Sequence, residues 1–200
     1  FIGGSIGYPC QMILQSQDGS YIEKIIGPWS KPQQADVVDV KIADFNGDKL
    51  LDIYTVSGGN ENNEGSQNYQ DHLYINKGNK IFKEVTNYLP KLNFSKSCIT
   101  TGDIDSDGDL DIFIGGRLVP GKYGKFVNSK LLKNNNNNNE ISTFHGILTN
   151  REILNDKNIS SSTNQYIIYS ISFVIDIERI RNTRKDCVTA NLKTTILQQP

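Results

Sequence analysis

The sequence contains few of the residues that build zinc sites and disulfide frameworks. Among its 200 residues are two histidines, His72 and His145, and three cysteines, Cys10, Cys98 and Cys187. No two of these residues have the spacing of zinc ligands, so a zinc site is not expected. Cys10 and Cys98 could pair, but one cysteine would be left over, and three well-separated cysteines do not define a disulfide framework.

An excess of charge and a long apolar run are also missing. The formal net charge is −1, so nothing in the composition indicates a nucleic acid or an anionic membrane surface as a partner. Residues 166–177 are too short and too interrupted a stretch to cross a bilayer, and no signal peptide is visible. We therefore expect a chain that neither binds nucleic acid nor inserts into a membrane.

Motifs of catalysis are present only as near matches. Residues 3–7 fit G-x-S-x-G, but the nucleophile elbow needs a helix after the serine, and Pro9 follows soon afterwards. Residues 116–123 nearly form a P-loop, but Tyr123 stands where Ser or Thr must hold Mg²⁺. Carboxylates packed on one loop would share a cation rather than divide the acid and base roles of a glycosidase. We predict that the chain is not an enzyme.

A dense acidic loop is the most informative feature of the sequence. Five aspartates stand on alternate positions, namely Asp103, Asp105, Asp107, Asp109 and Asp111. At about 4 Å in water two such charges repel by about 1 kcal/mol, and more where the loop is partly buried. Oxygen ligands on alternate residues of a tight loop suit Ca²⁺, which takes roughly six to eight oxygens. The alternative is a solvated acidic turn, which five carboxylates in register disfavour.

Residues 44–52 form a second copy of this loop. Oxygen-bearing side chains occupy its first, third, fifth and ninth positions as Asp44, Asn46, Asp48 and Asp52. The seventh position is Leu50, where the other loop has Asp109, so a backbone carbonyl is the expected ligand there. Lys49 replaces Gly108 of the other loop. This lysine brings a positive charge near the site and is expected to strain the turn, so we predict a weaker first site.

The segments that flank the loops predict strands rather than the helices of an EF-hand. An EF-hand needs a bidentate Glu at loop position twelve, and the two loops have Thr55 and Ile114 there. The flanks are short runs of β-branched and aromatic residues, followed by glycine pairs at residues 58–59 and 115–116. Each acidic loop is therefore predicted to be the turn of a strand-loop-strand unit.

The similarity between the two halves extends beyond the loops. Their first aspartates lie 59 residues apart, which suits a four-stranded sheet. A second hairpin is predicted at residues 73–86, with a counterpart at residues 12–23 and an incomplete third copy from Lys130. Residues 1–4 repeat residues 113–116, so the chain is expected to begin at the end of a unit. The pattern is typical of part of a repeat array.

Residues 99–116 resemble the core of the FG-GAP (VCBS) repeat, which occurs in calcium-binding β-propellers such as the integrin α-chain head. Gly115-Gly116-Arg117 stands where that family has its GAP triplet, and the Gly-Gly-Arg-Leu-Val-Pro-Gly-Lys-Tyr ending is closest to its secreted bacterial and cartilage-acidic-protein-like branch. The resemblance covers roughly residues 1–133. It implies an all-β, incomplete β-propeller with about two four-stranded antiparallel blades plus partial blades, since closed propellers have typically 4 to 8.

The chain is predicted to divide at residue 133. Before that point we expect a partial blade at 1–9, repeats at 10–59 and 70–117, and the start of a further repeat at 126–133. After it, an asparagine run leads into residues without an acidic loop or a Gly-Gly ending. Residues 134–200 are therefore expected to be a low-complexity or disordered tail outside the propeller. A shifted reading frame or unspliced sequence is the alternative explanation.

The resemblance also implies a ligand set and a role. Calcium would be held by Asp44, Asn46, Asp48, Asp52 and the Leu50 carbonyl, and by Asp103, Asp105, Asp107, Asp111 and the Asp109 carbonyl. The ion would cancel the repulsion and fix each hairpin. We expect a non-enzymatic module, extracellular or at the cell surface, that binds an unidentified protein or carbohydrate. The alternatives are an accessory or partial domain of a secreted polysaccharide-degrading enzyme and a purely structural spacer.

Overall fold

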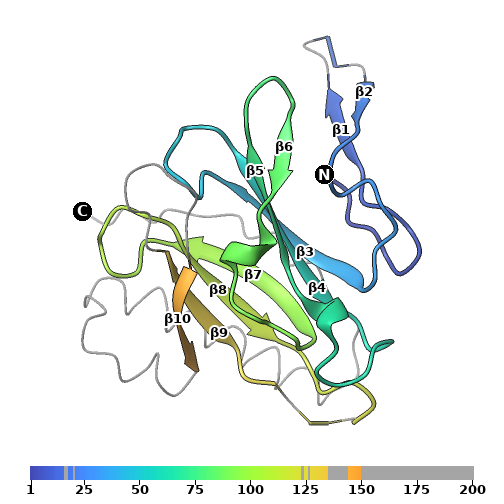
Figure 1. The fold of residues 1–200 in the computed structure, drawn as a ribbon, viewed down its shortest axis with the longest axis vertical. Coiled ribbons are helices and arrows are strands. Elements are labelled where there is room, and N and C mark those ends of the chain that lie inside the picture. Colours follow the sequence, from blue (N-terminus) through green and yellow to red (C-terminus); the bar gives the residue numbers. More distant parts are fainter. Residues whose placement is uncertain (16–17, 20, 123, 126, 135–143, 150–200) are drawn as a thin grey trace, which may run out of the picture.

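The computed structural model describes residues 1–149, apart from residues 16–17, 20, 123, 126 and 135–143. These residues form an all-β structure with two single-turn 3₁₀ helices (Figure 1). The strands are β1 (Met12–Gln15), β2 (Tyr21–Ile25), β3 (Asp36–Ala43), β4 (Asp52–Gly58), β5 (His72–Asn76), β6 (Phe82–Glu84), β7 (Lys96–Gly102), β8 (Asp111–Gly116), β9 (Lys130–Asn134) and β10 (Phe144–Thr149). The 3₁₀ helices are η1 (Gln67–Tyr69) and η2 (Thr86–Tyr88).

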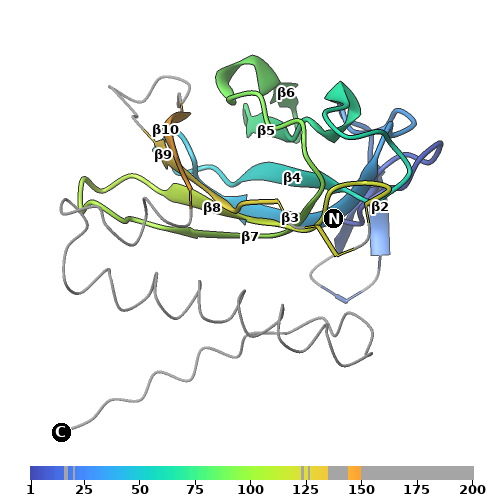
Figure 2. The same cartoon turned by 90° about the horizontal axis from the view of Figure 1, so that it is seen from below.

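Eight of the strands form two four-stranded antiparallel blades. The first blade has the order β3-β4-β5-β6 and the second has the order β7-β8-β9-β10. The blades are joined by one parallel pairing, between Gly58 at the end of β4 and Lys96 at the start of β7. Figure 2 shows β3 and β7, the first strands of the two blades, running next to one another. Each acidic loop is a turn between two strands, as predicted from the sequence, and these are the first two strands of its blade.

The N-terminal hairpin packs on the first blade. Strands β1 and β2 form a separate two-stranded sheet, and Ile2 pairs with Gln11 just before it. Trp29 is fully buried in this contact, where its ring makes edge-to-face contacts with Phe1, Tyr74 and Phe82 at 5.0–5.4 Å. Such aromatic pairs contribute roughly 0.5–1.5 kcal/mol beyond the burial of their area. The hairpin therefore covers the face of the first blade that carries Ile53 and Tyr74.

The other face of the first blade packs on the second blade. Because side chains alternate along a strand, Ile53 faces the N-terminal hairpin whereas Tyr54 and Val56 face the opposite way. Tyr54 and Val56 share a buried cluster with Ile112 and Ile114 of β8. Full burial of one large apolar side chain stabilises a fold by roughly 1.5–3 kcal/mol. Both faces of β4 are thus covered, which explains why this strand is buried along its whole length. Sheets stacked in this way define an incomplete β-propeller.

A buried ion pair also joins the blades. Nζ of Lys96 lies 3.0 Å from Oδ1 of Asp71, and neither side chain is exposed. The ammonium also donates to the Tyr69 carbonyl, while Asp71 accepts from the Tyr54 hydroxyl at 3.0 Å and from the Ser57 amide at 2.8 Å. Burial lowers the pKa of Lys96 and raises that of Asp71, and the attraction between the two charges opposes both shifts. This pair was not predicted from the sequence.

The blades do not divide the chain as the sequence predicted. The hydrogen-bonded sheets start at the acidic hairpins, at residues 36 and 96, and each includes the hairpin that follows in the chain. The second blade also continues past the expected boundary at residue 133, because Asn134 is buried in β9 and residues 144–149 pair with it as β10. The prediction for the tail otherwise falls on residues 135–143 and 150–200, which lie outside the described part of the chain. Within that part, no helix has the length and apolar character that crossing a bilayer requires.

Candidate metal site

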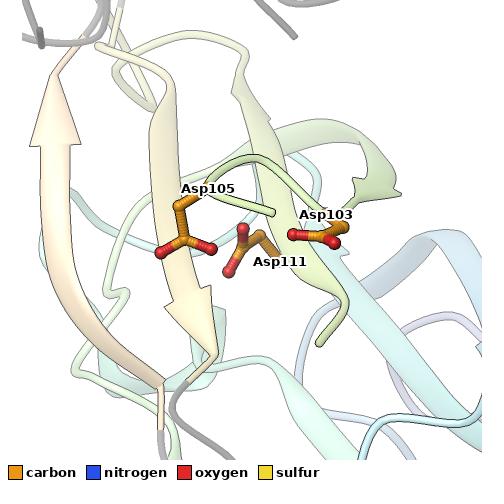
Figure 3. A group of neighbouring side chains, drawn as sticks. All are labelled: Asp103, Asp105 and Asp111. Atoms are coloured by element: carbon orange, nitrogen blue, oxygen red, sulfur yellow. The ribbon is translucent and has the colours of Figure 1, made fainter. Parts of the chain in front are cut away.

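Three aspartates of the second acidic loop converge on one space. Asp103 and Asp105 come from the turn between β7 and β8, and Asp111 is the first residue of β8. One carboxylate oxygen from each lies within 4.8 Å of the others, and Figure 3 shows the three carboxylates gathered at the mouth of the turn. No other group of three His, Cys, Asp or Glu side chains meets this criterion among the residues that the structure describes.

The backbone of the turn is folded around Asp103. Its two carboxylate oxygens accept hydrogen bonds from the amides of Asp107 at 3.1 Å and Gly108 at 3.0 Å. The turn needs a positive φ at Ser106 and at Gly108, with values of 64° and 94°. Glycine adopts this conformation without strain, whereas serine does not. The aspartate at the first position therefore closes the turn even before any ion is considered.

Asp111 fastens the loop to the next hairpin. It is fully buried, and its oxygens accept from the amides of Ile104 at 2.9 Å and Asn134 at 2.8 Å. The pKa of Asp111 is raised to about 6, mainly because the carboxyl group is buried. The two hydrogen bonds lower this pKa, whereas the charges of Asp105 and Asp107 raise it. When no cation is bound, the ionised form of the loop is therefore disfavoured by burial of Asp111 and by repulsion between its carboxylates.

Asp105 has one oxygen in an ion pair and one without a partner. Its Oδ2 lies 3.3 Å from Nζ of Lys133 on β9. Its Oδ1 is buried and has no hydrogen-bond partner among the described residues. Next to it, the Asp109 amide lowers the pKa of Asp107, but desolvation and the charges of Asp105 and Asp109 raise it more, so the net shift is upward. A buried carboxylate oxygen without a donor is well suited to a cation.

The first loop has a closely similar hydrogen-bond scheme, in which the first aspartate accepts from the amides at loop positions four and six rather than five and six. Asp44 accepts from the amides of Gly47 at 2.8 Å and Lys49 at 2.7 Å. Asp52 is fully buried and accepts from the amides of Phe45 at 3.0 Å and Asn76 at 2.8 Å. Burial, which is partly offset by these two bonds, raises the pKa of Asp52 to about 6. The two loops are therefore structural repeats as well as sequence repeats.

Two differences distinguish the first loop from the second. Lys49 has φ of 68°, so the strain predicted for a lysine in place of Gly108 is present. Asn46, in place of Asp105, donates from Nδ2 to Oδ2 of Asp48 at 2.9 Å. This amide and carboxylate satisfy each other, and the loop carries fewer negative charges. Both differences agree in direction with a weaker first site, which remains a prediction.

The structure brings together only some of the predicted ligands. Asp103, Asp105 and Asp111 face one another, while Asp107 accepts a hydrogen bond from the Asp109 amide at 2.9 Å. In the first loop, Asp48 likewise accepts from the Leu50 amide at 2.8 Å. Metal coordination by the carbonyls of Leu50 and Asp109 stays a prediction.

Sequence reasoning missed Asn76, Asn134 and Lys133. The asparagines end the matching segments Leu73-Tyr74-Ile75-Asn76 and Leu131-Leu132-Lys133-Asn134, and their shared position was a usable signal. Ser5, the central residue of the near catalytic motif at residues 3–7, lies between the isolated bridges of Ile2 and Ile6 and is not on a strand-to-helix turn.

Stacked four-stranded blades, each with an acidic turn between its first two strands, define a repeat of the β-propeller class. The family model described as FG-GAP-like repeat matches residues 44–114, from the first aspartate of one loop into the strand after the other. This match supports the assignment of residues 44–114 to the FG-GAP-like repeat family. A search of curated proteins found no match.

Proposed function

We propose that the chain is a calcium-binding propeller segment that acts as an extracellular binding or adhesion module for a protein or a carbohydrate. The observation that carries the proposal is the second acidic loop, where three carboxylates lie within 4.8 Å and one buried oxygen, Oδ1 of Asp105, lacks a donor. The role is a non-enzymatic one, in which the ion fixes the scaffold and the loops bind the partner.

The donor set fits calcium better than other common ions. All candidate side-chain ligands are oxygens, which disfavours zinc. The site offers several carboxylates from one turn, which suits the variable geometry of Ca²⁺, whereas Mg²⁺ demands near-octahedral geometry and retains its waters. Two charges at about 4 Å repel by about 4 kcal/mol at an effective dielectric constant near 20. A divalent cation among Asp103, Asp105 and Asp111 would replace that repulsion with attraction, so binding free energy would become folding free energy.

The partner surface is proposed at the opposite end of the blades. The loops after β4 and after β8 lie side by side there, as Figure 1 shows. They are linked by a hydrogen bond from the Gly121 amide to Oδ1 of Asn60 at 3.0 Å and by an ion pair between Lys122 and Glu64. Loops held on a rigid scaffold are where binding residues concentrate. Calcium sites of the weaker, extracellular class would be filled outside cells, which supports an extracellular role for the chain.

Thermal unfolding of the full chain, with millimolar calcium and then with a chelator, tests the proposal. Calcium at one hundred times its dissociation constant stabilises by about 2.7 kcal/mol, which corresponds to a rise of about 5–10 °C in Tm at this size. Asp103→Asn combined with Asp105→Asn should reduce the rise to what the weaker first loop supplies, and adding Asp48→Asn should abolish it. Glu64→Gln, at the other end of the blades and half exposed, is the matched control and should keep it. No rise in the unmodified chain would refute the calcium site.

A separate experiment tests the partner. The calcium-loaded chain is applied to arrays of glycans and extracellular proteins, and a specific ligand should be retained. A hit that survives the charge reversal Lys122→Glu together with Asn60→Ala would place the binding surface elsewhere. Calcium stabilisation without any ligand would favour a structural spacer instead.

A further inference from the structure

Lys133 lies outside the acidic loop, on β9, yet its side chain reaches the loop. Nζ of Lys133 is 3.3 Å from Oδ2 of Asp105, and the two side chains are only 24% and 23% exposed. The ammonium group therefore lies beside the carboxylates that converge in Figure 3. It reaches them from the hairpin that follows the loop in the chain.

The first repeat has no lysine at this position. The residue that precedes Asn76 on β5 is Ile75, which is buried in the core between the blades. The two positions correspond because Asn76 and Asn134 make the same backbone contact, each donating its amide at 2.8 Å to the ninth-position aspartate of its loop. Lys133 is thus a specific feature of the second repeat.

We infer that Lys133 is a built-in counter-ion of the second loop, which stabilises the metal-free loop and lowers its affinity for calcium. This inference rests on the proposed calcium site. The attraction between Lys133 and Asp105 is strongest while the loop carries its full negative charge. A bound divalent cation neutralises that charge and repels the ammonium. Lys133 therefore favours the metal-free state, and by linkage the lysine and the ion weaken each other.

The geometry allows this antagonism without steric blocking. Lys133 pairs with Oδ2 of Asp105, and the oxygen without a partner is Oδ1. A cation can therefore bind Oδ1 while the ammonium stays near. The lysine then sets the calcium concentration at which the site fills rather than preventing it from filling.

The experiment compares Lys133→Met with Lys130→Met, which removes the same charge from the same strand. Both are made in the full chain carrying Asp48→Asn, which removes one acidic ligand from the first loop. Thermal unfolding with a chelator measures the metal-free state, and isothermal titration with calcium chloride measures the dissociation constant. Lys133→Met should lower the metal-free Tm and lower the calcium dissociation constant by about fivefold or more. Lys130→Met should change both little.

A further variant ties the effect to the ion pair. In a chain that also carries Asp105→Asn, Lys133→Met should no longer lower the metal-free Tm, because its partner charge is gone. Unchanged or weaker calcium binding in Lys133→Met would overturn the inference while leaving the calcium site intact. Absence of calcium binding in every variant, the unmodified chain included, would overturn the inference and the proposed function together.

Discussion

Removing the buried ammonium of Lys96 should strongly destabilise the contact between the blades. In Lys96→Met, Asp71 would remain fully buried, and only hydrogen bonds from the Tyr54 hydroxyl and the Ser57 amide would stabilise its charge. The Tyr69 carbonyl would also lose its donor. Breaking a buried pair by removing one partner costs about 3–5 kcal/mol. Because a domain is stable by only about 5–15 kcal/mol, this loss is a large part of the total.

Urea unfolding followed by circular dichroism measures the effect. The matched control is Lys122→Met, which breaks an ion pair whose side chains are 54% and 50% exposed and should cost less than about 1 kcal/mol. The double variant Lys96→Met with Asp71→Leu should be less destabilised than Lys96→Met alone, because it leaves no buried charge uncompensated. A cost below about 1 kcal/mol for Lys96→Met would refute this account of the pair.

Three further predictions concern the acidic loops. Lys49→Gly should stabilise the metal-free chain by up to about 1 kcal/mol in urea unfolding. Glycine adopts the left-handed conformation without strain, but it also raises the entropy of the unfolded chain, which limits the gain. The reverse change, Gly108→Lys, should destabilise the chain, and unchanged stability in both variants would contradict the strain argument. Asp52 and Asp111 have pKa values raised to about 6 from 3.8, so the folded state binds more protons than the unfolded state between those values. With a chelator, Tm should therefore fall as pH rises from about 4 to about 6, and calcium should remove this slope. A flat metal-free profile would show that these carboxyls do not titrate abnormally. Asp111→Ala should cost about 2–4 kcal/mol even without calcium, since two buried amides lose a charged acceptor. Calorimetry with a chelator measures this loss, and an unchanged stability would contradict the role of Asp111.

The local features of the fold could be predicted because their causes are local. Alternating β-branched and aromatic residues around the acidic turns define the hairpins β3-β4 and β7-β8. The turn residues in the two acidic loops occupy matching places, so the strained φ of Lys49 followed from its alignment with Gly108. The repeat spacing and the resemblance then indicated stacked blades.

Long-range contacts could not be predicted in the same way. The grouping of hairpins into blades depends on which faces bury each other, and a repeat period has no fixed starting point. Lys96 looks like an ordinary polar residue until Asp71, 25 positions earlier, is placed beside it. Lys133 directly precedes the asparagine run and Asn134 is its first residue, so the low-complexity composition concealed their role in the second loop.

The hydrogen bonds from the amides of Asn76 and Asn134 to Asp52 and Asp111 make each acidic loop depend on the hairpin that follows it. Each buried aspartate receives one amide from its own loop and another from a strand 23 or 24 residues further along the chain. During synthesis, the second acidic turn would emerge well before the residue that completes it. A fragment that stops at residue 133 would leave an oxygen of Asp111 without its donor. Each acidic loop is thus complete only when the following hairpin has docked, so the four strands of a blade depend on one another.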